Sequence, residues 1–406
     1  MKTIVIIGAG HEQVPAYRIA RSKGLCIVGT DINPNAPAFK FADHALFVST
    51  RDAAETCRVV TSFARRHEIS GVMTIANDVP YTVAKVAEAL SLPCASSSAI
   101  LNLSDKVKMK RILSSKGIST PFFEVINSRS ELKAAFLNHS PPLVLKPSDG
   151  RGSRGVLYLE EETSLGAAYD YSKDQGDGGS LLLEEYWPGP QLSVEGVFLE
   201  GKFHCVAFAD RNYSNLPQTK PYIIEDGGTL PTRFDDFTKS AIEELVDAAA
   251  RAMGITWGPV KADIVLSSQT GEPAIIELAG RLSGNYFATH HIPFSYGVDL
   301  VSVVIDLSLA DYVDPARVRA TCNRHLGVRY FFPSPGKIEA ISGVDSVKRL
   351  PYVHKLILAR EAGQDQPPIR CHPDRAGTVM THGSTYEQAT ERAVCAASQI
   401  HFDIVN

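Results

Sequence analysis

Apolar runs of four or five residues recur along the first hundred residues of the chain, with longer amphipathic segments between them. The runs predict buried strands at 3–7, 25–29, 45–48 and 71–75. The segments at 14–23, 52–67 and 80–90 have the apolar spacing of helices. Near-continuous apolar strands that alternate with helices are typical of a doubly wound parallel sheet.

Polar residues follow several of these strands. Ligands of doubly wound sheets bind outside the carboxyl ends of the strands. Small-molecule contacts are therefore expected among Gly8, Gly10, His11, Glu12, Asp31, Asn77 and Asp78. A dinucleotide site is disfavoured, because Gln13 stands where the third glycine of Gly-x-Gly-x-x-Gly would let the helix pack on the strand.

A glycine-rich, cationic turn lies between two apolar segments in the middle of the chain. Residues 143–146 and 156–159 predict two strands, and the turn between them contains Gly150, Gly152 and Gly155. Glycine can adopt the positive φ that lets successive backbone N–H groups point at one anion. The pattern favours a β-hairpin flap that covers a bound phosphate. An ordinary basic hairpin is the alternative.

Two acids end the next apolar segment. The run at 180–184 ends in Glu184 and Glu185, and the stiff turn at 186–190 separates it from a strand at 192–199 that carries Glu195. A strand end followed by a hinge suits the edge of a purine and a ribose. Solvated surface acids are the alternative.

A helix is predicted from a Ser104 cap to Ser115, closed by Gly117. Lys106 then falls in the first turn, where the helix dipole disfavours a cation. A lysine at this position indicates a nearby anion, although Asp105 beside it also offsets the cost.

A second predicted hairpin carries an acid on each strand. Residues 261–266 and 274–278 predict adjacent strands, with Asp263 on the first and Glu277 on the second. Buried carboxylates are costly unless they are paired or bind a cation, and two on neighbouring strands suit Mg²⁺ that bridges phosphates. An ion-pair network with Arg281 is the alternative. His290 and His291, which would point to opposite faces of a strand, are interpreted as structural.

Composition limits the classes of partner. The 406 residues exceed one ordinary core and predict two or three domains. A net charge of −4 gives no reason to expect nucleic acid or an anionic membrane as partner, and no apolar run is long enough to span a bilayer. Seven scattered cysteines without a Cys-x-x-Cys pair fit a reducing cytoplasm. A homodimer is a candidate assembly, with an interface helix expected at 311–319.

Taken in order, five motifs resemble those of the ATP-grasp superfamily, specifically its carboxylate–amine ligase branch. They are Ser104-Asp105-Lys106, Leu143–Val156, Leu183–Gly196, Lys261–Leu266 and Ile275–Asn285. The resemblance extends over essentially the whole chain. It implies an N-terminal pre-ATP-grasp α/β domain at 1–103, a two-lobed ATP-grasp domain at 104–320 with a small flap lobe at about 120–190, and a C-terminal subdomain at 321–406 that completes the large lobe.

The same resemblance implies roles for individual residues. The ATP contacts would be Lys106, Lys146, Gly152, Ser153, Arg154, Gly155, Glu184, Glu185, Tyr186, Gln191 and Glu195. Asp263 and Glu277 would hold one or two Mg²⁺ ions, with Mn²⁺ as a substitute. Arg281 and Lys146 would be catalytic, and the substrate contacts would be Arg281, Ser283, Asn285, His11 and Asn77.

The chain departs from the pattern of related ligases at three positions. Gln191 replaces a ribose-binding Glu after the Gly-Pro turn, so that ribose recognition passes to Glu195 or elsewhere. The first metal position is Asp263 rather than the commoner Glu. Ala279 replaces an Asn two residues after the second metal position, which removes one possible oxygen ligand.

The expected activity is phosphorylation of a small-molecule carboxylate by ATP, followed by attack of an amine on the acyl phosphate. Phosphorylation supplies a leaving group, and the chemistry needs charge neutralisation and alignment more than a protein nucleophile. A bicarbonate-activating carboxylase is the alternative, disfavoured because the chain has no Met-Lys biotinylation segment. A non-catalytic nucleotide-binding regulator is disfavoured by the joint presence of Asp263, Glu277 and Arg281.

Overall fold

The computed structural model describes residues 1–405. Its N-terminal part is a four-stranded sheet in the order β3-β2-β1-β4, with every neighbouring pair parallel. The strands are β1 Thr3–Ile7, β2 Cys26–Asp31, β3 His44–Phe47 and β4 Gly71–Met73, connected through helices α1 Val14–Ser22, α2 Ala53–Ala64 and α3 Pro80–Leu90. All five residues of β1 are buried, as the continuous apolar run requires. The predicted parallel α/β sheet is confirmed.

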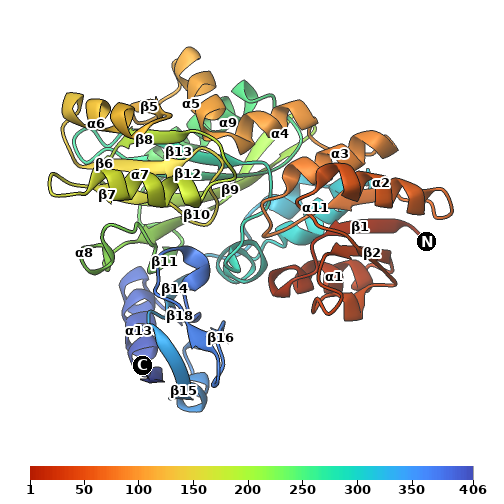
Figure 1. The fold of residues 1–406 in the computed structure, drawn as a ribbon. Helices are drawn as coiled ribbons and strands as arrows, with labels where there is room; N and C mark the ends of the chain where they lie inside the picture. Colours follow the sequence, from red (N-terminus) through yellow and green to blue (C-terminus); the bar gives the residue numbers. More distant parts are fainter. Residues whose placement is uncertain (406) are drawn as a thin grey trace.

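The predicted flap hairpin belongs to a small antiparallel sheet with the order β5-β8-β6-β7. Its strands are β5 Phe123–Ile126, β6 Leu143–Pro147, β7 Leu157–Leu159 and β8 Leu181–Glu185. Helices α6 Arg129–Asn138 and α7 Leu165–Asp174 cover it (Figure 1). Its apolar side chains form a core of their own, which allows this sheet to move as one body.

An eight-stranded sheet crosses the centre of the molecule. Its order is β13-β12-β9-β10-β11-β14-β18-β16, so the C-terminal strands continue the same sheet as the strands before residue 280 (Figure 1). The strands are β9 Gln191–Leu199, β10 Lys202–Asn212, β11 Gly227–Leu230, β12 Gly258–Leu266, β13 Pro273–Ala279, β14 His325–Tyr330, β16 Val353–Leu358 and β18 Gly377–Gly383. Helices α9 Asp236–Ala252 and α13 Tyr386–Ser398 pack on it, and the short strands β15 Gly336–Ser342, β17 Asp365–Gln366 and β19 His401–Val405 form a separate sheet.

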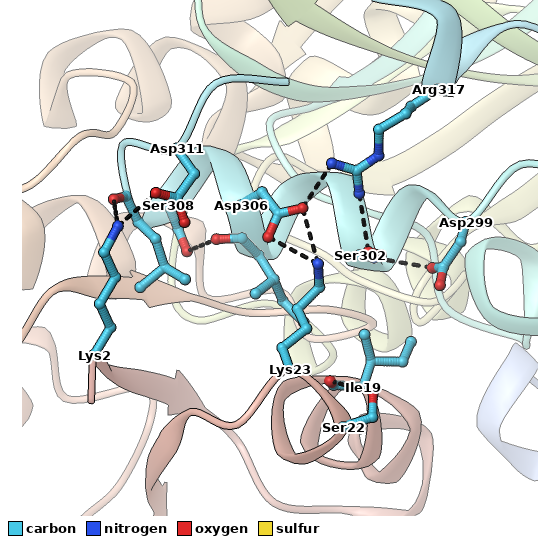
Figure 2. Close-up of polar contacts among 12 residues, drawn as sticks. Lys2, Ile19, Ser22, Lys23, Asp299, Ser302, Asp306, Ser308, Asp311 and Arg317 are labelled. Carbon is cyan, nitrogen blue, oxygen red and sulfur yellow. Dashed lines mark hydrogen bonds and ion pairs between the residues drawn. The ribbon is translucent and has the colours of Figure 1, made fainter. Parts of the chain in front are cut away.

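Helix α11 Leu300–Ser308 packs against the N-terminal sheet, although it is far from that sheet in sequence. Its valines join the same core cluster as the side chains of β1. Figure 2 shows the polar contacts at this junction: Lys23 Nζ lies 2.9 Å from both carboxylate oxygens of Asp306, and Arg317 Nη1 donates to Asp306 Oδ2 at 2.7 Å. Asp306 is 8% exposed, so two cations neutralise a buried carboxylate.

Three local predictions were wrong. The helix that carries Lys106, α5 Lys106–Ser115, is capped by Asp105, because α4 Ser97–Ser104 already occupies Ser104. The two adjacent histidines lie in a π-helical turn, Phe287–His291, and not in a strand. The helix expected at 311–319 is only the 3-10 turn Pro315–Val318, because Asp314 and Pro315 start a new turn there. No helix in the described chain is both long and apolar enough to cross a membrane.

The ion pairs of Asp306 predict a large stability effect at one position. Asp306→Ala leaves two cations without their buried partner and should lower the free energy of unfolding by about 2 kcal/mol. Urea denaturation at constant m-value measures the change. The matched control is Asp311→Ala, because Asp311 pairs with Lys2 on the surface and both side chains are nearly half exposed; its loss should cost less than about 1 kcal/mol. Equal effects of the two substitutions would contradict this account of the junction.

Candidate functional site

A cavity of about 590 Å³ lies where the small sheet, the central sheet, the N-terminal sheet and the C-terminal segment meet. Among the residues with predicted roles, those on its wall are Lys106, Lys146, Gly152, Ser153, Glu184, Glu185, Tyr186, Gln191, Asp263, Glu277, Arg281, Ser283 and Asn285. Residues from Lys106 to Asn285, almost 180 positions apart in the sequence, therefore line one cavity.

The flap loop covers one side of the cavity, and contacts with three distant parts of the chain help to hold it. Lys106 Nζ donates to Gly150 O at 2.7 Å, His372 N–H donates to Gly152 O at 3.0 Å, and Ser153 Oγ donates to Ile223 O at 2.5 Å. Gly152 has φ +60, a conformation that favours glycine. Two predicted loop residues, Arg154 and Gly155, do not line the cavity.

A buried charge network stands behind the flap hairpin. Lys146 Nζ lies 2.8 Å from Glu184 Oε2, and Lys110 Nζ lies 3.3 Å from Glu184 Oε1. Lys110 is 0% exposed, and burial lowers its pKa to about 8 although Glu184 opposes this shift. Burial by itself would raise the pKa of Glu184, but the two ammonium groups lower it below its usual value. Glu184 is therefore an ionised carboxylate with two fixed cations.

Sequence reasoning missed Lys110. It occupies the same helical face as Lys106, Met109 and Leu113, with spacings of three and four residues, and Met109 and Leu113 are fully buried. A lysine among the apolar residues of one helix face is the pattern that could have identified Lys110 from the sequence. The predicted acid Glu195 does not line the cavity: it is fully buried, and its Oε1 accepts a hydrogen bond from Ser283 N–H at 3.0 Å.

The two predicted metal-binding acids are cross-strand partners. Asp263 on β12 pairs with Glu277 on β13, next to an irregularity in the register. Alternate residues of β12 point to opposite faces, so Ala262 and Ile264 enter the core while Lys261 and Asp263 line the cavity. This is why a hairpin with an otherwise apolar pattern can present acids to the cavity.

Cations surround both acids. Asp263 Oδ1 lies 3.0 Å from Arg211 Nη1, and Lys261 also contacts this carboxylate. Burial would raise the pKa of Asp263, but Arg211 and Lys261 hold it well below the ordinary value. Glu277 Oε1 lies 3.1 Å from Lys106 Nζ; burial would raise its pKa and Lys106 lowers it. Both carboxylates are therefore ionised near neutral pH.

The loop after β13 connects this region to the N-terminal sheet. Ile75, just after β4, forms a parallel bridge with Leu282. Arg281 Nε donates to Asp78 Oδ1 at 2.7 Å, and Asn285 N–H donates to Glu12 Oε2 at 2.7 Å. The carboxyl ends of the N-terminal strands thus reach the same cavity as the acids on β12 and β13.

Two predicted substrate contacts from the N-terminal sheet lie away from the cavity. His11 is exposed and Asn77 is half-buried, and neither lines the cavity. Their neighbours Glu12 and Asp78 line it instead. A 3-10 turn at His11–Gln13 separates the directions of adjacent side chains, which no sequence pattern indicated.

The C-terminal segment contributes residues to which the sequence analysis assigned no role in the site. Arg375 and His372 line the cavity with Tyr330 of β14. Arg375 is 4% exposed, and its guanidinium carbon lies 3.6 Å from the centre of the Tyr330 ring. These residues reach the cavity through long-range packing, and their local sequence contains no pattern that predicts it.

Comparison with known proteins gives three family matches along the chain. Residues 4–93 match the PylC-like N-terminal domain, residues 103–285 match the ATP-grasp domain, and residues 329–405 match the L-amino acid ligase C-terminal domain 2. The central match contains the flap, Asp263, Glu277 and Arg281. Residues 103–285 are therefore an ATP-grasp domain.

Relatives of this ATP-grasp protein are distant in sequence. It is 24% identical over 320 residues to the uncharacterized protein y4rH of Sinorhizobium fredii, covering 77% of this chain and 64% of that protein. It is 24% identical over 248 residues to alanine–anticapsin ligase of Bacillus subtilis, covering 55% of this chain and 51% of that enzyme. The chain thus spans only half to two-thirds of the length of these two relatives.

Solved structures share the whole architecture. The L-amino acid ligase from Bacillus licheniformis superposes with a TM-score of 0.84 at 23% identity, over 100% of this chain and 99% of that one. Phosphoribosylglycinamide synthetase from Anaerococcus prevotii gives a TM-score of 0.75 at 17% identity, with both chains fully covered. These likenesses establish the fold of the ATP-grasp chain.

The acids of the ATP-grasp cavity fit a divalent cation that also binds a nucleotide. Asp263 and Glu277 are ionised oxygen ligands on adjacent strands, the donor type that Mg²⁺ prefers. Residues 1–405 contain no group of three or more His, Cys, Asp or Glu side chains placed to hold a metal ion. The pair therefore suits Mg²⁺ that takes its remaining ligands from phosphate oxygens and water.

The buried network behind the flap predicts a stability difference between two lysines of one helix. Lys110→Met removes one of the two cations that neutralise Glu184 and should lower the free energy of unfolding by about 3 kcal/mol. Lys108→Met, at an exposed position of α5, should change it by less than about 0.5 kcal/mol. Chemical denaturation of the two variants tests the difference. Wild-type stability of Lys110→Met would show that Glu184 does not need its second cation.

Glu195 predicts a pH dependence of stability. Burial raises its pKa to about 7, with Ser283, Arg281 and Lys261 opposing the shift. Since the folded-state pKa exceeds the unfolded one, this group's stabilisation is complete at low pH and is lost as pH rises through about 7. Glu195→Gln should therefore gain stability relative to the wild type between pH 5 and pH 8, measured as thermal midpoints across that range. A difference between the two proteins that stays constant with pH would refute the raised pKa.

Proposed function

We propose that this ATP-grasp protein is an ADP-forming ligase that activates a small-molecule carboxylate as an acyl phosphate and joins it to an amine. The observation that carries the proposal is the meeting of Asp263, Glu277 and Arg281 in one cavity beneath the flap. A protein that only binds a nucleotide needs no third group placed to anchor a second substrate. The named activities of the two ligases above, L-amino acid ligase and alanine–anticapsin ligase, support the same reaction class.

The phosphate end of ATP would lie between the flap and the paired acids. Lys106, Lys146 and the flap backbone at Gly152 and Ser153 supply positive charge and N–H donors there. Bound Mg²⁺ would neutralise charge on the phosphates. Glu185, Tyr186 and Gln191 line the cavity where the β8 strand ends, and we assign the adenine and ribose to them.

Arg281 would position the carboxylate substrate for phosphorylation. Its guanidinium is oriented by Asp78. Burial would raise the pKa of Asp78, but Arg281 holds it below the ordinary value, so this pair remains charged. A carboxylate held beside Arg281 can attack the terminal phosphoryl group, with ADP as the leaving group. The amine gives up its proton to a nearby carboxylate or to a phosphate oxygen and then attacks the acyl carbon, and phosphate leaves. This step requires alignment rather than a protein nucleophile.

The cysteines and the cavity bear on the compartment and on the size of the substrates. All seven cysteines are free thiols, which supports our proposal of a reducing, cytoplasmic location. The substrates we propose are small molecules, because the polar groups line a cavity between the sheets rather than a charged outer surface.

Release of phosphate from ATP tests the proposed reaction. The purified protein is screened with amino acids and other carboxylates, each with and without an amine. ADP formation that needs both a carboxylate and an amine supports ligation. Release with bicarbonate alone would assign the protein to the bicarbonate-activating class, and tight ATP binding without release under any condition would identify a regulator.

Glu277 predicts the effect of losing one metal ligand. Glu277→Gln keeps the size of the side chain but removes the charge that would hold Mg²⁺, so turnover should fall by about 100-fold or more. Excess Mg²⁺ should restore part of the loss. Glu272→Gln, on the exposed turn of the same hairpin, is the control and should leave the rate unchanged. Full turnover in Glu277→Gln would remove this residue from the mechanism.

A further inference from the structure

The charges on the wall of the cavity are paired, with one exception among the cations. The side chains concerned are Lys106 with Glu277, Lys146 with Glu184, Arg151 with Asp177, Arg211 and Lys261 with Asp263, and Arg281 with Asp78. Arg375 is the remaining cation of the wall, and it forms no ion pair with any carboxylate of residues 1–405. Arg375 is therefore the one guanidinium of the wall without an ion-pair partner in the described residues.

Arg375 is fixed in place by neutral oxygens. Its Nε donates to His372 O at 2.9 Å, its Nη1 donates to the backbone oxygen of Glu225 at 3.1 Å, and its Nη2 donates to Asn285 Oδ1 at 2.9 Å. The Tyr330 ring covers one face of the guanidinium. These contacts set the direction of a buried cation without neutralising it, and a buried charge is costly until it meets an opposite one. The arrangement is that of a preorganised anion site.

An acid without an ion-pair partner in the described part of the chain lies on the other side of Asn285. Glu12 lines the cavity, and its Oε2 accepts the backbone N–H of Asn285 at 2.7 Å. Burial raises the pKa of Glu12, while Asn285 and the nearby guanidinium groups of Arg375 and Arg281 lower it. Asn285 thus holds the unpaired cation through its side chain and the unpaired acid through its backbone.

We propose that Arg375 and Glu12 form the binding site of the amine substrate, in which Arg375 binds a carboxylate of that substrate and Glu12 faces its ammonium group. The substrate class is an amine that carries its own carboxylate, because a zwitterion neutralises both groups at once. This inference rests on the proposed ligation, and it leaves Arg281 to the carboxylate that becomes phosphorylated. Arg375 is a specificity-determining residue, since it contacts a part of the substrate that does not react.

The test compares amino acids with their carboxamides, which keep the amine and lose the negative charge. Equilibrium binding is measured by calorimetry for a panel of amino acids and their carboxamides, in the presence of a non-hydrolysable ATP analogue. The wild type should bind at least one amino acid about 100-fold more tightly than its carboxamide. Arg375→Met should erase that preference, and Arg375→Lys should restore part of it. Arg349→Met, at an exposed position with no role in the cavity, is the control and should behave as the wild type.

A second measurement separates the two substrates. Hydroxylamine is a small amine without a carboxylate, so it should trap the acyl phosphate as a hydroxamate in Arg375→Met at the wild-type rate. Loss of hydroxamate formation in this variant would mean that Arg375 serves the activated acid or its phosphoryl group, and would overturn the proposal. An unchanged preference for the amino acid over its carboxamide, or no such preference in the wild type, would also overturn it. A wild type that forms no hydroxamate with any acid would instead refute the proposed ligation, while the binding comparison still decides the role of Arg375.

Discussion

The carboxylates of Asp263 and Glu277 face each other across two neighbouring strands, and cations from three separate elements of the chain meet them. Lys106 comes from helix α5, Arg211 from β10 and Lys261 from β12 itself. Burying charges of one sign would be prohibitive, so the acids and bases of this cavity must arrive together. The charge pairs of the site therefore depend on how the lobes pack. If one element were displaced, a buried charge would lose its partner.

The continuous central sheet makes this meeting possible. Strand β11 pairs with β14, so the C-terminal strands extend the sheet that carries both acids. The loop with Arg375 is therefore held at a fixed distance from Asn285, which follows β13 at the other end of the sheet. The small sheet with the flap has its own core. A rigid platform beneath a separately packed flap is the arrangement expected of a protein that admits a nucleotide and then encloses it.

The N-terminal sheet is joined to the platform by two kinds of interaction. Helix α11 fills its apolar face, and Asp306 neutralises Lys23 and Arg317 at the edge of that contact. On the cavity side, the bridge between Ile75 and Leu282 brings strand ends of one sheet to the loop of the other. The carboxyl ends of parallel strands, where ligands bind in such sheets, thus become one wall of a shared site.

The sequence by itself determined the elements and most of their chemistry. The apolar segments at 261–266 and 274–278 placed Asp263 and Glu277 on adjacent strands, the continuous run of β1 indicated a buried parallel strand, and the order of five motifs indicated the ATP-grasp resemblance. It did not determine which of two chain neighbours lines the cavity: Glu12 and Asp78 do, whereas His11 and Asn77 do not. At the first pair, a 3-10 turn points the adjacent side chains in different directions. Only tertiary packing brought Arg375 beside Asn285, 90 residues away. Local patterns record which residues can be buried, and long-range packing decides which charges meet.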